Sequence, residues 1–395
     1  MNIIILRSSF QSDDFVRTEY AELLGLLKDK CNAEITILGD ENVETCHGTS
    51  LRDANFIMIA TGGVENLFKT IWSTGALKTT TLVADGRNNS LAASLEILSF
   101  LTENGQEGRI IHGDNDTIIR DVTDTQFIAS QQSGNNGSCI FLGTRIGLFG
   151  KPSDWLIASG VDYDYLREYY GIQTVFIDLQ RLIDMVGTSE KSDMLMADKT
   201  YNAIKKICQE ERLDAMTIRC FDIVKACNTT SCLALAKLND EGIVAGCEGD
   251  MQTLMTMLLA RKLFNEPAFM ANPSILTDKT SMFAHCTVPL SMCYRTTMRT
   301  HFESGIGVAV QGDMPLTDYT IMKWGGRRLD KMFVTEAKAI KNEYSNHFCR
   351  TQITFDINLK PYLLNHSIGN HHVIIKGCHA AEIRRFMREN GIKLS

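Results

Sequence analysis

The sequence lacks paired cysteine motifs, although its 395 residues include 12 cysteines. No two of them are spaced as CxxC, the pairing from which zinc centres with four thiolate ligands are built. We also expect no disulfide framework, because long cytosolic chains rarely depend on one. Most of the cysteines are therefore expected to be buried, reduced thiols that pack as small hydrophobic side chains.

Long apolar runs and an excess of basic residues are missing as well. No segment approaches the roughly 20 apolar residues that cross a bilayer. The start, "MNIIILRSSFQSDDF", has no basic region and only a short apolar run, so it does not predict a signal peptide and we expect a cytoplasmic protein. The formal net charge is −7, which argues against a nucleic-acid partner.

The sequence does contain a regular alternation of apolar strands and helical patterns over its first two thirds. Runs such as "MNIIIL" and "ANFIMIATGG" are separated by amphipathic segments. This pattern predicts parallel sheets covered on both faces, as in doubly wound α/β domains. A chain of this length predicts two or three domains. We expect the first α/β domain at 1–140, ending at the linker-like "SGNNGSC" (133–139), and the second at 141–268.

The pattern changes after about residue 265. Short apolar or alternating runs follow one another, and several are separated by Gly, Pro, Asn or Asp. They predict a β-rich third domain at 269–395, built as an antiparallel barrel or sandwich. Among the individual elements, we expect one helix over 13–30, a helical segment over 153–160 and a strand over 214–223.

Two carboxylates lie between a strand and a helix in "VAGCEGDMQTLMTMLLARKLF", residues 244 to 264. Asp250 is predicted to cap the helix that follows it. A cap does not explain Glu248, which is expected at the carboxyl end of the strand. In open α/β sheets, ligands bind at that end of the strands. Glu248 is therefore a candidate functional residue.

Polar residues in apolar surroundings extend the candidate site. Seven of the nine histidines follow residue 280, and "GNHHV" places His371 and His372 on opposite faces of a strand. Asn272 lies before a proline, and Glu303 lies in "HFESG"; turn residues are the alternative interpretation for both. Arg219, inside an apolar strand, needs a carboxylate or an anionic ligand.

Carboxylate, imidazole and amide groups together form an oxygen-rich site that suits a hard divalent cation. Such ligands favour Mn²⁺ or Mg²⁺, and the histidine favours a transition metal such as Mn²⁺. Metals that prefer thiolate ligands are not indicated. For each histidine taken alone, a hydrogen-bonded structural role remains the alternative.

Four motifs together carry a family resemblance: "CEGDMQTLMTMLL", "NPSI…AHCTVP", "HFESGIGVAVQG" and "GNHHVIIKGCH". In this order the sequence resembles the L-fucose isomerase/L-arabinose isomerase superfamily, and most closely its shorter fucose-isomerase-like members. The resemblance implies two α/β domains followed by a β-rich domain. It also implies Mn²⁺, with Mg²⁺ or Co²⁺ as alternatives, and interconversion of an aldose and a ketose through an enediol. Members of the superfamily are homo-oligomers, so a trimer, tetramer or hexamer is expected.

The resemblance assigns roles to particular residues. The implied metal ligands are Glu248, Asn272 and His371. The resemblance also implies Glu248 as a catalytic carboxylate and His285 as a site histidine that binds the substrate. Glu303 and Asp250 are our further candidates for catalysis. Arg219 and Lys323 are our further candidates for orienting hydroxyls or an acidic group of the substrate.

One position departs from the family pattern. Fucose isomerases have an aspartate 24 residues after the glutamate, where this sequence has Asn272, and an alignment with arabinose isomerases places Met270 at their second glutamate. An amide oxygen can bind a metal but cannot act as a base. Glu303, Asp250 or a metal-bound hydroxide would have to replace the missing carboxylate.

The sequence therefore predicts a metal-dependent aldose–ketose isomerase that acts on a small monosaccharide in the cytoplasm, with no nucleic-acid or membrane partner. Two alternatives remain open. The first is a related epimerase or lyase of sugars or sugar acids. The second is a non-catalytic sugar-binding protein on the same scaffold, because fold alone does not determine function.

Overall fold

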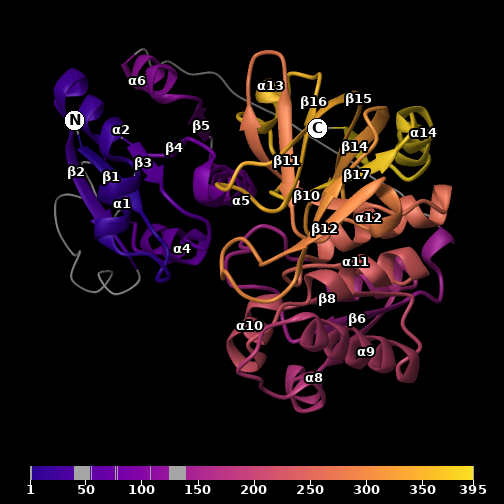
Figure 1. The fold of residues 1–395 in the computed structure, drawn as a ribbon. Helices are drawn as coiled ribbons and strands as arrows, with labels where there is room; N and C mark the ends of the chain where they lie inside the picture. Colours follow the sequence, from indigo (N-terminus) through magenta and orange to yellow (C-terminus); the bar gives the residue numbers. More distant parts are fainter. Residues whose placement is uncertain are drawn as a thin grey trace.

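The computed structural model describes residues 2–39, 54, 56–75, 77, 79–106, 108–123 and 139–394. Most of the segment 133–139, which we interpreted as a linker, lies outside these residues. Figure 1 shows two sheets flanked by helices and a third, β-rich part formed by the end of the chain. The predicted fold class, two doubly wound α/β parts followed by a barrel, is confirmed.

The first sheet has five parallel strands in the order β2-β1-β3-β4-β5. Its strands are β1 (Asn2–Leu6), β2 (Glu34–Leu38), β3 (Phe56–Ile59), β4 (Thr81–Ala84) and β5 (Arg109–His112). Its helical elements are α1 (Asp13–Glu19), α2 (Ala21–Cys31), α4 (Glu65–Ser73), η2 (Arg87–Asn89), α5 (Ser90–Glu103) and α6 (Asn115–Thr123). Strand β2 lies on one side of β1, and β3 and the later strands of this sheet lie on the other side. This reversal of strand order places a topological switch point between β1 and β3.

The second sheet has four parallel strands in the order β7-β6-β8-β9. Its strands are β6 (Arg145–Phe149), β7 (Gln173–Ile177), β8 (Ala215–Ile218) and β9 (Val244–Gly246). The helical elements are η3 (Cys139–Phe141), α7 (Tyr163–Tyr170), α8 (Leu179–Val186), α9 (Met194–Glu210), α10 (Cys220–Cys227), α11 (Cys232–Glu241) and α12 (Met251–Phe264). A second switch point therefore lies between β6 and β8.

The third part is a closed antiparallel barrel. Strand β14 pairs with both β17 and β15, which closes the ring β14-β17-β10-β11-β16-β15, and β18 adds to β15 in parallel. The barrel strands are β10 (Phe269–Leu276), β11 (Ser281–His285), β14 (Asp318–Gly325), β15 (Lys331–Glu343), β16 (Thr351–Phe355), β17 (His372–Lys376) and β18 (Lys393–Leu394). The remaining elements are η4 (Leu290–Met292), the hairpin β12 (Arg295–Arg299) and β13 (Ala309–Asp313), α13 (Lys360–Leu363) and α14 (Ala380–Glu389).

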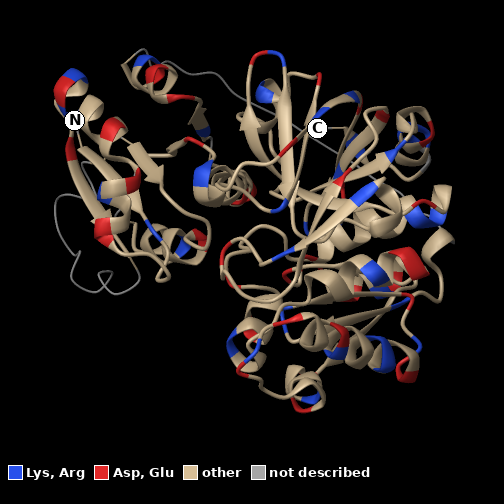
Figure 2. Ribbon diagram, in the orientation of Figure 1, with Lys and Arg blue, Asp and Glu red and all other residues tan. Residues whose placement is uncertain are grey.

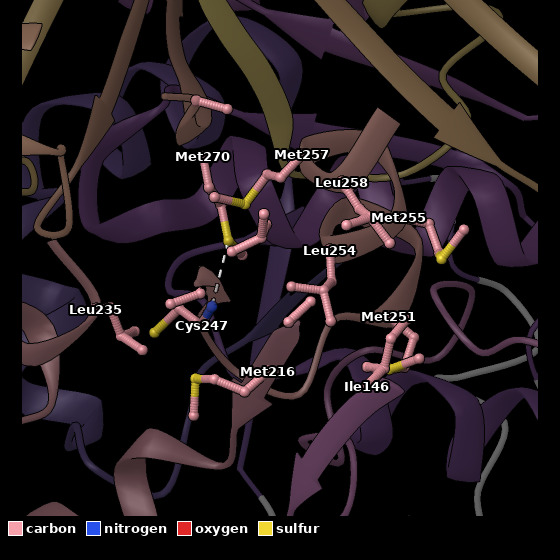
Figure 3. Packing of buried hydrophobic residues seen from close by; sticks show 14 of the residues in the cluster. Ile146, Met216, Leu235, Cys247, Met251, Leu254, Met255, Met257, Leu258 and Met270 are labelled. Atoms are coloured by element: carbon pink, nitrogen blue, oxygen red, sulfur yellow. Dashed lines mark hydrogen bonds between the residues drawn. The ribbon is translucent and has the colours of Figure 1, made fainter. Parts of the chain in front are cut away.

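Helix α12 is the central element between the barrel and the second sheet. It contacts β8 and β9 on one side and β10, β14 and β17 on the other. All ten residues from 251 to 260 are buried, including the polar Gln252, Thr253 and Thr256, so this part of the helix lies in the core on every side. Figure 3 shows part of this core, in which the Met270 sulfur accepts a hydrogen bond from the backbone N–H of Cys247. Met270 therefore belongs to the core.

Charged residues do not gather by sign. Figure 2 shows acidic and basic residues interspersed over the helices of both sheets and around the barrel. Within the described part of the chain, no helix combines the length and the apolar character needed to cross a membrane.

Three element predictions were wrong. The segment 13–30 forms two helices, α1 and α2, that meet at Tyr20, whose hydroxyl donates to the Ala60 carbonyl oxygen at 2.6 Å. Residues 153–160 form no helix because their backbone is held by other side chains. Glu96 of α5 accepts from the N–H groups of Ala158 and Ser159, at 2.7 Å each.

The third wrong prediction is the strand over 214–223. Strand β8 ends at Ile218, and helix α10 begins at Cys220. Arg219 lies between the two elements, where its guanidinium pairs with Asp154 and Asp222. These two ion pairs supply the carboxylates that a partly buried arginine needs. Arg219 therefore meets its partners just after the strand and not within the sheet. The domain boundaries at 140 and 268 remain predictions.

Replacing Leu254 with alanine tests the role of α12 in the core. Leu254 is fully buried in this helix, so Leu254→Ala is expected to lower the free energy of unfolding by about 2–5 kcal/mol through lost contacts and a residual cavity. Leu195→Ala is the matched control, because Leu195 is 75% exposed on α9 and should change stability by less than about 0.5 kcal/mol. Denaturant unfolding measures both; equal losses would contradict the packing described.

Candidate active site

A cleft of about 270 Å³ lies where the two sheets and the barrel meet. The first sheet contributes residues that follow β1, β3 and β4, including Ser8, Thr61 and Asn89. The second sheet and the barrel contribute Glu248 and Asn272 together with others from the same loops and strands. Most of these positions follow the carboxyl ends of parallel strands, at the switch points where α/β sheets bind ligands.

Glu248 reaches the cleft from a sharp turn after β9. Its φ angle is +62° and that of Gly249 is +74°, a left-handed conformation that is costly for a residue with a side chain. Gly249 cannot be replaced easily, because a Cβ there would lie 2.7 Å from the Pro152 Cα. The Trp155 indole donates to Glu248 Oε2 at 2.6 Å and fixes the carboxylate. The glycine turn therefore directs a carboxylate into the cleft.

Asp250 lies beside this turn and orients His371. Its Oδ1 accepts from the Thr253 N–H at 2.8 Å and so caps α12, as predicted. Its Oδ2 lies 2.9 Å from His371 Nδ1 and 3.7 Å from the Lys323 ammonium. Burial opposes the charge on Asp250, but Lys323 and His371 outweigh it and hold the pKa of the carboxyl far below its usual range.

His371 links Asp250 to Glu248. Its Nε2 lies 3.7 Å from Glu248 Oε1, which is too long for a hydrogen bond, so the contact is an ion pair across a gap. Burial disfavours the imidazolium, but the charges of Glu248 and Asp250 outweigh it and raise the pKa of His371 to about 9. Burial likewise opposes ionisation of Glu248. The charge of His371 and the hydrogen bond from Trp155 outweigh this effect, so the pKa of the Glu248 carboxyl is lowered.

Two buried polar atoms beside Glu248 have no hydrogen-bond partner: Asn272 Oδ1 and His371 Nε2. Buried polar atoms without a partner are costly unless a ligand satisfies them. Two oxygen or nitrogen ligands of one ion, each about 2.1 Å from it, lie at most about 4.2 Å apart. The 3.7 Å between His371 and Glu248 is within that limit, so the residues present fit a hard divalent cation.

Two further histidines stand near the cleft in their neutral form. The rings of His285 and His371 are 5.5 Å apart, and His285 Nδ1 lies 2.8 Å from Thr287 Oγ1. Burial and the neighbouring His371 lower the pKa of His285 to about 3. Burial lowers the pKa of His301 to about 4. Neutral imidazoles of this kind can accept a hydrogen bond or bind a metal.

Glu303 is the second predicted carboxylate that lines the cleft. It accepts a hydrogen bond from Asn89 Nδ2, which joins the barrel part to the first sheet. The side chain is open to the cleft, but the surrounding protein and the charge of Glu248 raise the pKa of Glu303 to about 8. A carboxyl that titrates near neutral pH is suited to accept and return a proton.

Like His285 and His371, three further predicted residues do not line the cleft. Arg219 is engaged by Asp154 and Asp222, and fully buried Lys323 donates to Thr253 Oγ1 at 2.9 Å. Asp250, also fully buried, has the contacts of a positioning residue. Direct roles of these three in substrate binding or catalysis stay predictions.

The expected alternation of His371 and His372 holds in the structure. His372 Nε2 lies 3.0 Å from the Tyr362 hydroxyl in the core, and burial lowers the pKa of His372 to about 3.

Sequence reasoning missed several residues that line the cleft, among them Glu65, Asn89 and Trp155. Glu65 is buried, its Oε2 has no hydrogen-bond partner, and burial raises the pKa of its carboxyl well above the usual value. In the sequence it resembles any acidic residue in the first turn of a helix. The loop after β3, where "TGG" precedes that helix, was the available signal.

The pairing of Asp250 with His371 predicts a pH-dependent effect of Asp250→Asn on the metal-free protein. The variant leaves Lys323 and His371 without their carboxylate, at an expected cost of about 3–5 kcal/mol. Glu248 and Asp250 together raise the pKa of His371 from 6.5 to about 9. The part of this stabilisation that Asp250 supplies to His371 is therefore complete below pH 6.5 and is lost as the pH rises through 9. Thermal unfolding from pH 5 to 9.5 measures the difference from wild type.

The double variant Asp250→Asn/Lys323→Met is the control for this experiment. It removes the unpaired ammonium, so it should be more stable than Asp250→Asn alone. A difference between wild type and Asp250→Asn that stays constant across the pH range would contradict the proposed pairing.

Comparison with known proteins gives partial matches. No protein-family model matches the chain. Sulfoquinovose isomerase of Priestia aryabhattai is 33% identical over 167 residues, which are 36% of this chain and 37% of that protein. The enzymes of the same name from Alkalicoccus urumqiensis and Clostridium sp. (strain MSTE9) are 26% identical over 141 and 166 residues, or 32% and 36% of their lengths. The matches thus span about a third of these relatives, and over that part the chain is similar to sugar isomerases.

Proposed function

We propose that this protein is a divalent-metal-dependent aldose–ketose isomerase that acts on a monosaccharide. The observation that carries the proposal is that Glu248, Asn272 and Glu303 line one cleft, with His371 3.7 Å from Glu248, although the four residues are far apart in the sequence. The similarity to sulfoquinovose isomerases supports it. The cleft is concave, has apolar walls that include Trp155, and carries a few convergent polar groups, as small-molecule sites do.

Glu248, Asn272 and His371 would hold the cation, for which Mn²⁺ is our first candidate. Such an ion, when bound, polarises a sugar carbonyl and lowers the pKa of the adjacent hydroxyl. Asp250 keeps His371 Nε2 directed towards Glu248 by occupying Nδ1, in the way that a carboxylate fixes a metal-binding histidine. Trp155 holds Glu248 in place from the other side.

Glu303 is our candidate for the group that moves the proton. As a carboxylate it would remove the proton from C2 of an open-chain aldose and return it to C1, through an enediol. Asn272 cannot do this, because an amide is not a base. Glu303 lines the same cleft as Glu248, and its raised pKa of about 8 makes it a stronger base than an ordinary carboxylate.

Sulfoquinovose, the sugar in the names of the relatives, is the first substrate to test. It carries a sulfonate, and such a group needs a cationic or hydrogen-bonding partner. Among the described residues that line the cleft, Lys225 is the basic side chain, and its ammonium lies 5.2 Å from the Phe10 ring centre. We propose that Lys225 faces the end of the substrate remote from Glu248.

Solvent exchange is the direct test of the reaction. Protein loaded with Mn²⁺ is incubated in D₂O with sulfoquinovose and with neutral aldoses and ketoses, and the products are followed by NMR. We expect conversion between aldose and ketose with deuterium introduced at C1 or C2. Lys225→Ala should raise KM for sulfoquinovose but not for a neutral substrate. Exchange at another carbon, chain cleavage, or binding without exchange would contradict the proposed reaction.

The pH dependence of turnover tests the role of Glu303. Because the base must be ionised, kcat/KM of the wild type is expected to rise with pH as Glu303 loses its proton. The pKa of about 8 applies to the metal-free protein, and a cation held by Glu248 offsets the charge of that carboxylate, so the rise is expected below pH 8 in the Mn²⁺-loaded enzyme. Glu303→Gln should lower kcat by about 10²–10⁴-fold and leave Mn²⁺ affinity unchanged. Glu248→Gln is the matched control, since it should weaken Mn²⁺ binding, measured by titration of metal-free protein. A Glu303→Gln variant with wild-type kcat would exclude this role.

A further inference from the structure

A second, much smaller cavity adjoins the cleft. Its volume is about 20 Å³, enough for a single water molecule or ion and too small for a sugar. It shares Glu248 and Asn272 with the cleft and is also lined by His285. Five cysteines complete its wall: Cys220, Cys232, Cys247, Cys286 and Cys349.

The thiols come from separate elements that are far apart in the sequence. Cys220 begins α10, Cys232 begins α11, and Cys247 follows β9. All five are free and buried. The Cys247 and Cys220 sulfurs are 3.2 Å apart. The expectation from the sequence that thiolate-preferring metals are not indicated considered only the spacing of cysteines along the chain, and this spacing does not reveal thiols that the fold brings together.

Cys247, Glu248 and His285 offer three different ligand types around this cavity. One ligand atom from each lies within 4.8 Å of the other two. Tetrahedral zinc, with bonds of about 2.3 Å to sulfur and about 2.1 Å to nitrogen or oxygen, places such atoms roughly 3.6 Å apart. Small side-chain rotations would therefore close the set. His285 Nδ1 faces Thr287, which leaves Nε2 as the nitrogen directed to an ion.

We propose that this cavity is an inhibitory site for a thiophilic divalent cation such as Zn²⁺, ligated by Cys247, Glu248 and His285. Thiolate and imidazole ligands select zinc-like ions over Mn²⁺ or Mg²⁺. On binding, the Cys247 thiol loses its proton to solvent and forms a metal–sulfur bond. The inhibition rests on the proposed function, because the ion would take Glu248 away from the hard-cation site. The binding of the thiophilic ion does not depend on the proposed function.

Cobalt absorption tests the binding without relying on activity. Metal-free protein is titrated with Co²⁺, whose bond to a thiolate gives a charge-transfer band in the near ultraviolet. We expect the band to saturate at one equivalent, to be removed by Zn²⁺ and to resist Mn²⁺. Cys247→Ser should abolish it. Cys208→Ser is the matched control, because Cys208 is also buried but lies on α9 and not in the cavity wall.

Two outcomes would overturn the proposal. The first is the absence of a thiolate band in the wild type, a result that does not depend on the folding of any variant. The second is an unchanged band in Cys247→Ser. His371→Asn separates the two sites, since it should lose Mn²⁺ binding and keep the cobalt band. A retained band with no isomerase activity on any sugar would sustain the thiol site and count against the proposed function alone. If isomerisation is found, Cys247→Ser should need at least about tenfold more Zn²⁺ for inhibition.

Discussion

One buried carboxylate, Asp250, holds the candidate site together. It caps α12, contacts the imidazole of His371 just before β17, and faces the ammonium of Lys323 on β14. These three groups are removed from water, so each would be costly without the others. Their mutual contacts lock the barrel onto the second sheet at one point. Glu248, two residues before Asp250, lies 3.7 Å from the same His371, so its place in the site depends on this contact.

The location of the cleft follows from strand order rather than from any single residue. In each parallel sheet the connections leave neighbouring strands in opposite directions, which opens a crevice at the carboxyl ends. The first sheet opens one between β1 and β3, and the second opens one between β6 and β8. Glu303 and Asn89, which meet across the gap, join the two crevices into one cleft closed by the barrel. Loops can thus supply polar groups while the sheets keep them fixed.

The sequence predicted the elements whose signals are local. The alternation of apolar runs and helical patterns identified both sheets and the β-rich end. Asp250 was recognised as a helix cap, and the doubled histidine indicated opposite faces of a strand. Features that depend on distant partners could not be predicted. Arg219 was placed in a strand because its partner Asp154 lies in a loop 65 residues away. The cluster of cysteines from five segments was not predicted, because their spacing along the chain does not show that the fold brings them together.

The neutral amide at Asn272 is consistent with the electrostatics of the cleft. Glu65, Glu248 and Glu303 already line it, and the charge of Glu248 contributes to the raised pKa of each of the other two. A fourth carboxylate would raise these pKa values further and favour protonated, inactive acids. An amide oxygen can bind a cation without adding charge. Its cost is the loss of a base at position 272. Burial, with the charge of Glu248 added to it, raises the pKa of Glu303 to about 8, at which this carboxyl can take over that task.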